Sequence, residues 1–123
     1  MLFMDTIIVD TSSILFALSK RIDIFERIDE QLGSKPVISK GIINELTELS
    51  KDKKAVSRNA AVALKLISSH SLIIDDNEDY PDNWILKDAK KFGKVCTNDT
   101  KLRQALRAMS IQACSISVKG VLK

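Results

Sequence analysis

The 123-residue sequence is poor in the residues that build disulfide frameworks and zinc sites. It contains two cysteines, Cys96 and Cys114, one histidine, His70, and no CxxC pair. This set is too small and too scattered for a zinc site, and His70 is too isolated to be a catalytic base. Both cysteines lie in apolar β-like segments, where reduced thiols act as small hydrophobic side chains. The chain also lacks a glycine-rich phosphate-binding loop, which argues against P-loop nucleotide hydrolysis.

Long apolar runs are missing as well. No segment approaches the roughly 20 apolar residues that a membrane-spanning helix requires. The opening residues 1–4 lack the basic region and cleavage site of a secretory signal peptide. We therefore expect a cytoplasmic protein with no membrane partner. The sequence has no internal repeat, low-complexity segment or linker, so its length predicts a single domain over residues 1–123.

Charge of neither sign dominates the sequence. The formal net charge is +3, and 45% hydrophobic and 28% charged residues are typical of a soluble globular protein. Residues 1–50 carry 5 basic and 8 acidic side chains, whereas residues 51–123 carry 14 and 8. The modestly basic second half is compatible with a polyanionic partner but does not require one. Tyr80 and Trp84 could stack on a nucleic-acid base, although Trp84 is more typical of a core residue.

Short apolar segments alternate with amphipathic ones along the chain. This pattern predicts a three-layer α/β/α sandwich with a central parallel sheet of about five strands. The expected strands are residues 6–9, 35–38, 72–74, 94–97 and 112–117, and the expected helices are residues 14–18, 24–32, 40–50, 59–67, 83–92 and 100–109. Right-handed crossovers place the carboxyl ends of all parallel strands at one edge of the sheet, where ligands of open α/β sheets bind.

Four acidic side chains are expected near that edge. Asp10 follows the first strand and Asp99 the fourth, while Glu45 lies in the helix after the second strand and Asp82 begins a later helix. Four oxygen donors without a thiolate or an imidazole favour Mg²⁺ or Mn²⁺. A metal held by such acids can activate water and stabilise an in-line phosphoryl displacement. If the acids converge, the set therefore predicts phosphodiester hydrolysis.

Spacing alone leaves a simpler interpretation open for each acid. Asp10 and Asp99 are also good helix N-caps, and Asp82 could cap a helix after Pro81. Glu45 could be a solvated surface residue. The acids that compete with these positions are Glu48, Asp75, Asp76 and Asp79. A receiver-like signalling domain would need an acidic pair at the first strand, an aspartate after the third and a lysine after the fifth, and only Asp10 is present, so we set it aside.

Four segments resemble, in family order, the four acidic motifs of the PIN-domain ribonucleases. They are residues 8–15 (IVDTSSIL), 42–46 (IINEL), 82–89 (DNWILKDA) and 95–102 (VCTNDTKL). No single motif is specific, but the ordered set of four spans almost the whole chain. Within the family, the alanine-rich helix and the Thr-Asn-Asp motif resemble the small archaeal proteins related to rRNA-processing PIN nucleases more than the VapC toxins.

The resemblance implies a PIN fold and an Mg²⁺- or Mn²⁺-dependent endoribonuclease that leaves a 3′-hydroxyl and a 5′-phosphate. It makes Asp10, Glu45, Asp82 and Asp99 both the metal-binding and the catalytic acids. Neighbouring side chains would orient metal ligands or contact the RNA. These are Thr11, Ser12, Thr97, Asn98, Lys101 and Arg103. The implied partners are RNA, an antitoxin or a ribosome-assembly factor, and a second copy of the chain.

Two positions depart from the family pattern. Many relatives carry a second acid directly after the third motif acid and another two places after the fourth, where this sequence has Asn83 and Lys101. The alternative to a nuclease is therefore a catalytically weak or inactive PIN-like domain that binds RNA or serves as a scaffold. For an active enzyme, a role in RNA processing, including that of rRNA, and a role as a VapC-type toxin both stay open.

Overall fold

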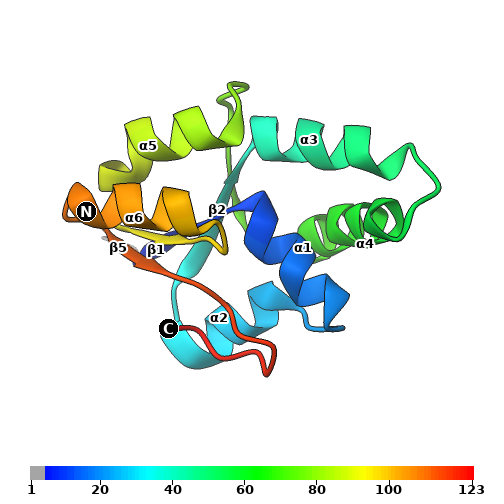
Figure 1. Ribbon diagram of the computed structural model, residues 1–123, viewed down its shortest axis with the longest axis horizontal. Coiled ribbons are helices and arrows are strands. Elements are labelled where there is room, and N and C mark those ends of the chain that lie inside the picture. The colour runs from blue at the N-terminus through cyan, green and yellow to red at the C-terminus, as the bar shows by residue number, and fades with distance from the viewer. Residues whose placement is uncertain (1–4) are drawn as a thin grey trace.

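The computed structural model describes residues 5–123 and confirms the α/β/α fold with a five-stranded parallel sheet (Figure 1). The strands are β1 (Thr6–Val9), β2 (Lys35–Ser39), β3 (Ile73–Asp75), β4 (Lys94–Cys96) and β5 (Gln112–Cys114). Their order across the sheet is β3-β2-β1-β4-β5, and every neighbouring pair is parallel. The expectation that no signal peptide is present concerns residues 1–4 and lies outside the described residues.

Six helices cover the two faces of the sheet in the described part of the chain. They are α1 (Thr11–Ser19), α2 (Ile24–Leu32), α3 (Lys40–Ser50), α4 (Ala55–Ser69), α5 (Pro81–Phe92) and α6 (Thr100–Ala108). Helices α1 to α4 lie on one side and α5 and α6 on the other (Figure 1). The chain moves outward from β1 to β3 and then returns to the far side of β1 for β4 and β5. The direction of winding therefore reverses between β1 and β4, which is where open α/β sheets bind ligands.

The central strand is buried on both of its faces, as the run of apolar residues predicts. Ile7, Ile8 and Val9 are all 0% exposed, which is typical of the middle of a parallel sheet between two helical layers. Trp84 of α5 is also 0% exposed, and its ring lies 6.1 Å from that of Phe92, measured between centroids. Its predicted place in the core is confirmed, so Trp84 is not available to stack on a nucleic-acid base.

Three helices begin earlier than the sequence predicts. Helix α1 begins at Thr11 and α4 at Ala55, so both include polar residues that the prediction assigned to connections. Helix α5 begins at Pro81, with Tyr80 at the N-cap position, so Asp82 lies inside the first turn and does not cap it. Proline suits the first helical position because the donor that it lacks would have no partner there.

Other element ends follow from local chemistry. Gly33 ends α2 in the left-handed conformation with φ 62°, as predicted. Strand β5 ends at Cys114, three residues before its predicted end, and Ile116 instead forms an antiparallel bridge with Leu122. Both cysteines are free thiols.

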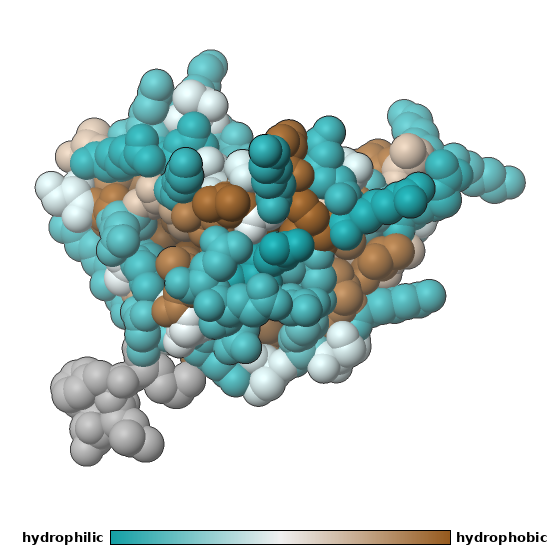
Figure 2. All heavy atoms as spheres, turned by 90° about the horizontal axis from the view of Figure 1, so that it is seen from below, coloured by the Kyte–Doolittle hydropathy of each residue, from teal (hydrophilic) through white to brown (hydrophobic). Residues whose placement is uncertain are grey.

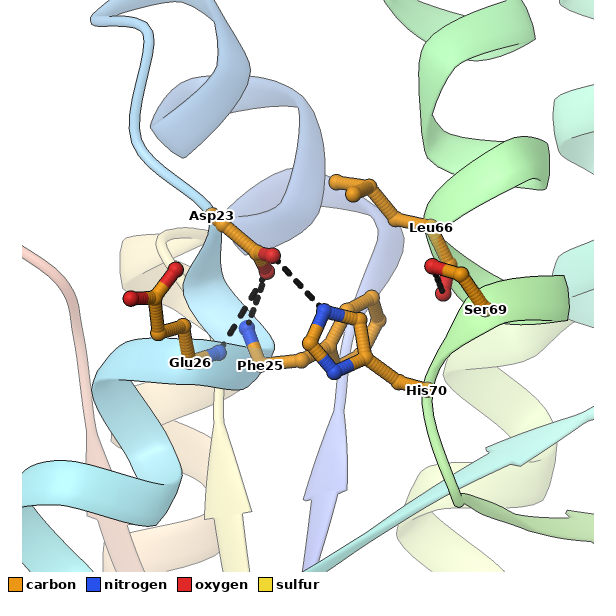
Figure 3. Close-up of polar contacts among 6 residues, drawn as sticks. All are labelled: Asp23, Phe25, Glu26, Leu66, Ser69 and His70. Atoms are coloured by element: carbon orange, nitrogen blue, oxygen red, sulfur yellow. Dashed lines mark hydrogen bonds and ion pairs between the residues drawn. The ribbon is translucent and has the colours of Figure 1, made fainter.

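Asp23 caps α2 and joins it to the end of α4 (Figure 3). Its Oδ1 accepts hydrogen bonds from the backbone N–H groups of Phe25 (3.0 Å) and Glu26 (3.3 Å). Its Oδ2 lies 2.7 Å from Nε2 of His70, the residue that follows α4. His70 precedes β3, at the amino end of that strand. The single histidine therefore has a structural contact away from the strand ends that carry the acids.

Among residues 5–123, no helix is both long and apolar enough to cross a membrane. Hydrophilic side chains cover most of the face in Figure 2, and hydrophobic side chains interrupt it in separate patches. The predicted homodimer stays a prediction.

Candidate active site

Asp10 leaves the carboxyl end of β1 and is almost completely buried, with 4% of its surface exposed. It occupies the N-cap position of α1, but its side chain makes no capping hydrogen bond. Instead, its Oδ2 accepts hydrogen bonds from Oγ of Ser12 (2.6 Å) and Oγ1 of Thr97 (2.8 Å). Asp10 is therefore held in place by hydroxyl groups from two separate motifs.

Asp99 follows β4, the neighbour of β1, and does act as a helix cap. Its Oδ1 accepts a hydrogen bond from the backbone N–H of Leu102 (3.1 Å), in the first turn of α6. Its own backbone N–H donates to Oγ1 of Thr97 (3.1 Å). One hydroxyl group thus fixes the positions of the two acids at the ends of β1 and β4.

A second set of hydrogen bonds fixes the backbone around these acids. Oγ of Ser12 accepts from the N–H of Asn98 (3.1 Å), and Oγ of the fully buried Ser13 donates to Oδ1 of Asn98 (2.7 Å). The Asn98 side chain also donates from Nδ2 to the carbonyl of Ile116 (3.0 Å) and accepts from the Ile116 N–H (3.1 Å). Asn98 therefore links α1 to the segment after β5, and its contact with substrate stays a prediction.

Ser13 is a positioning residue that the sequence analysis missed. The available signal was the run Thr11, Ser12 and Ser13 directly after the acid at the end of a buried strand. Three hydroxyl side chains in succession point in different directions from a helix, so one can enter the protein interior while its neighbours face the cleft. Spacing did not reveal that its partner would be Asn98, which is 85 positions away.

The other two acids come from helices beside the strand ends. Glu45 lies on α3 and Asp82 in the first turn of α5, and both residues are exposed. Together with Asp10 and Asp99 they line one cleft with a volume of about 300 Å³. The remaining lining residues are Thr11, Ser12, Leu15, Leu49 and Pro81. The structure therefore brings all four predicted acids into a single cleft.

The electrostatics of the cleft reflect four acids without a basic partner. Burial raises the pKa of Asp10, and the negative charge of Glu45 raises it further, while the hydrogen bonds from Ser12 and Thr97 act in the opposite direction. Partial desolvation raises the pKa of Asp82, followed by the charges of Asp10 and Asp99. None of the ion pairs among residues 5–123 includes any of the four acids. A bound cation would relieve this repulsion.

The donor chemistry of the cleft fits a hard divalent cation. Oγ1 of Thr11 is buried in the described structure without a hydrogen-bond partner, and Thr11 lines the same cleft as the acids. A buried hydroxyl without a partner is destabilising. A cation bound in the cleft would give this oxygen of Thr11 a partner. Carboxylate and hydroxyl oxygens are the donors that Mg²⁺ and Mn²⁺ prefer.

The cleft is not a preformed metal cage. No group of three acidic, histidine or cysteine side chains within residues 5–123 is close enough to hold an ion. Glu45 and Asp82 are the exposed members of the set, and no hydrogen bond or ion pair fixes their carboxylates in the described structure. The four acids thus fit a cation by their chemistry and their shared cleft, and binding requires the exposed side chains to close on it.

The acids that competed with these positions have other contacts. Glu48 forms an ion pair with Lys51 (2.9 Å), and Asp76 forms one with Lys40 (3.3 Å). Oδ1 of Asp75 accepts from the backbone N–H of Asn77 within a turn. None of these acids, nor Asp79, lines the cleft.

Two basic side chains of α6 lie just after Asp99 in the sequence. Arg103 is half-buried, and its Nη1 donates to the carbonyl of Thr97 (3.1 Å), so part of its guanidinium supports the strand end. Lys101 is exposed and has no ion-pair partner among the described residues. Their predicted contacts with RNA stay predictions.

Comparison with known proteins agrees with this geometry. The sequence model of the PIN like domain family matches residues 7–119. The structure of the PIN domain endonuclease Utp24 is similar, with a TM-score of 0.75 and 26% sequence identity, over 91% of this chain and 85% of that one. A domain of a functionally unknown protein from Methanocaldococcus jannaschii DSM 2661 has a TM-score of 0.66 and 21% identity, over 92% and 91%. This second likeness concerns the fold alone.

No curated protein sequence matches the chain significantly. The family model nevertheless covers nearly all of the sequence, including the four acids and the strands and helices that carry them. The chain therefore belongs to the PIN-like domain family.

Proposed function

We propose that this protein is a divalent-metal-dependent endoribonuclease that uses Asp10, Glu45, Asp82 and Asp99 as its metal-binding and catalytic acids. The observation that carries the proposal is that these acids, which are far apart in the sequence, line one cleft. The cleft lies where the winding of the sheet reverses. Membership of the PIN-like family and the likeness to a PIN domain endonuclease support nuclease chemistry.

Each acid contributes differently to the proposed site. Asp10 is the fixed member, since both of its hydroxyl partners bind Oδ2. Asp99 is held by its capping bond through Oδ1. Glu45 and Asp82 are exposed and free to adjust to the cation and to the RNA phosphate. When bound, Mg²⁺ or Mn²⁺ would activate a water molecule and neutralise charge that develops on the phosphodiester.

The surface of α6 next to Asp99 suits the RNA backbone. Lys101 is an exposed cation, and Arg103 presents the part of its guanidinium that does not bind Thr97. Phosphate contacts by such groups position a nucleic acid without reading its sequence. We propose these two residues, with Thr11 and Ser12 in the cleft, as the contacts that orient the substrate.

Cleavage of RNA by the purified protein tests the proposal. We expect end-labelled RNA with single-stranded and paired regions to be cut in Mn²⁺ or Mg²⁺ and to stay intact in EDTA. Asp10→Asn and Asp99→Asn should lower the rate by about 100-fold or more, because metal-assisted charge stabilisation contributes several kcal/mol. The matched control is Asp29→Asn, an exposed acid on α2 outside the cleft, which should cut like the wild type.

Two observations favour the alternative of an RNA-binding domain without turnover. No three acids form a closed set of ligands among residues 5–123, and Asn83 and Lys101 stand where many PIN relatives keep acids. If the wild type binds RNA but shows no cleavage in Mn²⁺, the alternative holds. Equal cleavage by the wild type and Asp10→Asn would contradict the assignment of the site.

Two cellular roles follow from an active enzyme. A toxin, paired with an antitoxin, should stop growth when it is expressed alone, and Asp10→Asn should restore growth. An enzyme of RNA processing, including rRNA with a ribosome-assembly factor as partner, should leave growth unchanged and alter the ends of specific transcripts instead. Induced expression followed by mapping of RNA ends separates the two roles.

A further inference from the structure

A second and larger groove adjoins the acidic cleft. It has a volume of about 490 Å³ and lies between α3 and the loop that leads into α5. Glu45, Leu49 and Pro81 line both hollows, so the groove and the cleft share a wall. The other lining residues of the groove are Gly41, Asn44, Glu48, Glu78, Asp79 and Tyr80. A polymer that crosses the acidic cleft can therefore extend directly into this groove.

The groove presents an aromatic ring to solvent. Tyr80 is 81% exposed, far more than the other large exposed hydrophobic residues of the described chain, which lie between 37% and 59%. An exposed tyrosine is ordinary by itself, but this one lines a hollow that shares three residues with the proposed active site. Tyr80 and Asp82 are separated only by Pro81, so the ring and a proposed catalytic acid begin the same helix.

The backbone of Tyr80 is fixed from both sides. Tyr80 precedes a proline, which favours its extended conformation (ψ 139°), and its carbonyl accepts the N–H of Trp84 (3.1 Å). Upstream, the N–H of Gly41 in α3 donates to the carbonyl of Asn77 (3.0 Å). A Cβ at Gly41 would overlap the carbonyl oxygen of Asp79. The loop thus packs directly on α3 and holds the backbone of Tyr80 in a defined position.

The charge of the groove indicates which part of an RNA chain fits it. Its four acids are Glu45, Glu48, Glu78 and Asp79, of which Glu48 pairs with Lys51 outside the groove, and no basic residue lines it. Phosphates would be repelled there, whereas a neutral base can stack on an aromatic ring. Carboxylates only accept hydrogen bonds, so they favour base edges that carry amino groups. Asn44 adds an amide to the same wall.

We propose that this groove is a nucleobase subsite, in which the base of a single-stranded nucleotide next to the scissile phosphate stacks on Tyr80. The inference rests on the proposed ribonuclease function and adds to it a base preference. We expect an amino-bearing base, adenine, cytosine or guanine, beside the cleavage site. Uracil is disfavoured relative to these bases because its N3–H is its only donor and it has no exocyclic amino group for the acidic wall.

Substitution of Tyr80 tests the subsite in two measurements. In cleavage of a single-stranded oligonucleotide, Tyr80→Ala should lower kcat/KM by about fivefold or more, the low end of base–aromatic stacking, while Tyr80→Phe keeps the ring and the activity. In binding without turnover, measured by fluorescence anisotropy in the Asp10→Asn background, Tyr80→Ala should weaken binding by a similar factor. Oligonucleotides of adenine or cytosine should bind more tightly than oligouridine.

A matched control separates the ring from general surface effects. Val118→Ala changes another exposed hydrophobic residue (59% exposed), after β5 and outside the groove, and should leave both measurements unchanged. Because Tyr80 is exposed, its variants should fold, which thermal unfolding checks. If the wild type cuts no RNA, the proposed function fails, but the binding measurement still tests the subsite.

Three results would overturn the subsite. The first is that Tyr80→Ala cuts and binds RNA like the wild type. The second is that Tyr80→Phe loses as much activity and affinity as Tyr80→Ala. The third is that oligouridine binds at least as tightly as the other oligonucleotides. A lysine-rich peptide that occupies the groove while RNA binding ignores Tyr80 would assign the groove to a protein partner instead.

Discussion

Oγ1 of Thr97 donates a hydrogen bond of 2.8 Å to Oδ2 of Asp10, although the two residues are 87 positions apart. The same oxygen accepts the backbone N–H of Asp99 at 3.1 Å. Oγ of Ser12 also donates to Asp10, so the protons of both hydroxyls are directed to one carboxylate, and their 3.2 Å contact with each other is secondary. The relative position of two proposed catalytic acids therefore depends on the side chain of Thr97.

Replacement of Thr97 by valine should weaken both the fold and the site. Thr97→Val keeps the shape but leaves the N–H of Asp99 without its partner, and we expect the free energy of unfolding to fall by about 1–3 kcal/mol. RNA cleavage should fall by about 10- to 100-fold, as for other groups that orient metal ligands. Thr97→Ser keeps the hydroxyl, so it should lose less stability and less cleavage activity than Thr97→Val. Urea denaturation and cleavage rates measure the two effects, and equal behaviour of the valine and serine variants would contradict the role of the hydroxyl.

Asp10 should make the metal-free protein less stable at neutral pH. Burial raises its pKa above the ordinary value of 3.8, so the folded state binds this proton more tightly than the unfolded state does. Stability is therefore lost as the pH rises from about 3.8 through the folded pKa, and the loss is complete above it. In EDTA, Asp10→Asn should be more stable than the wild type at neutral pH, and the difference should shrink as the solution is acidified.

Asp5 provides a control with the opposite sign. Hydrogen bonds from Lys94 and Ser34 lower the pKa of Asp5, so its contribution stabilises the protein at neutral pH and disappears as the pH falls through the folded pKa. Asp5→Asn should therefore be less stable than the wild type at neutral pH. Unfolding free energies between about pH 2 and pH 7 measure both variants, and a pH-independent difference for Asp10→Asn would refute the burial argument.

A divalent cation should stabilise the fold by relieving repulsion among the four acids. At a Mn²⁺ concentration of about 100 times the dissociation constant, linkage adds about 2.7 kcal/mol to the free energy of unfolding. Asp99→Asn should show a smaller rise in Tm, whereas Asp29→Asn, outside the cleft, should match the wild type. Thermal unfolding with and without Mn²⁺ measures the effect. No rise in the wild type would argue that the four acids do not share a cation.

The architecture could be predicted from the sequence because it depends on local patterns and on handedness. The apolar run at Ile7 and Ile8 identifies a doubly buried strand, and right-handed crossovers then bring the acids after β1 and β4 to one edge. Helix ends were less predictable. Helix α5 begins at Pro81, so Asp82 reaches the cleft from the first turn of the helix and is not its N-cap.

Contacts between distant segments could not be predicted. The pairing of Asp23 with His70 and that of Ser13 with Asn98 join residues 47 and 85 positions apart. Neither residue type nor periodicity encodes such a partner, because the contact exists only once helices and strands have packed. The groove at Tyr80 could not be predicted for the same reason, because it forms where the loop before α5 packs on α3.

Gly41 should be required for the loop before α5 to pack on α3. In an ordinary exposed helix, replacement of glycine by alanine is stabilising by up to about 1 kcal/mol. Here the added Cβ would overlap the carbonyl oxygen of Asp79, so the loop must move, and the N–H of Gly41 would lose its geometry with Asn77. We expect Gly41→Ala to be destabilising by about 1–3 kcal/mol, as for other overpacked sites.

Displacement of this loop should also disturb the ring of Tyr80, so Gly41→Ala should weaken RNA binding in the same direction as Tyr80→Ala. Thr47→Ala, at an exposed position of the same helix, is the matched control and should leave RNA binding unchanged. Urea denaturation and fluorescence anisotropy measure the two effects. A Gly41→Ala variant as stable as the wild type would mean that the loop does not pack on α3, and the fixed presentation of Tyr80 would then have no structural basis.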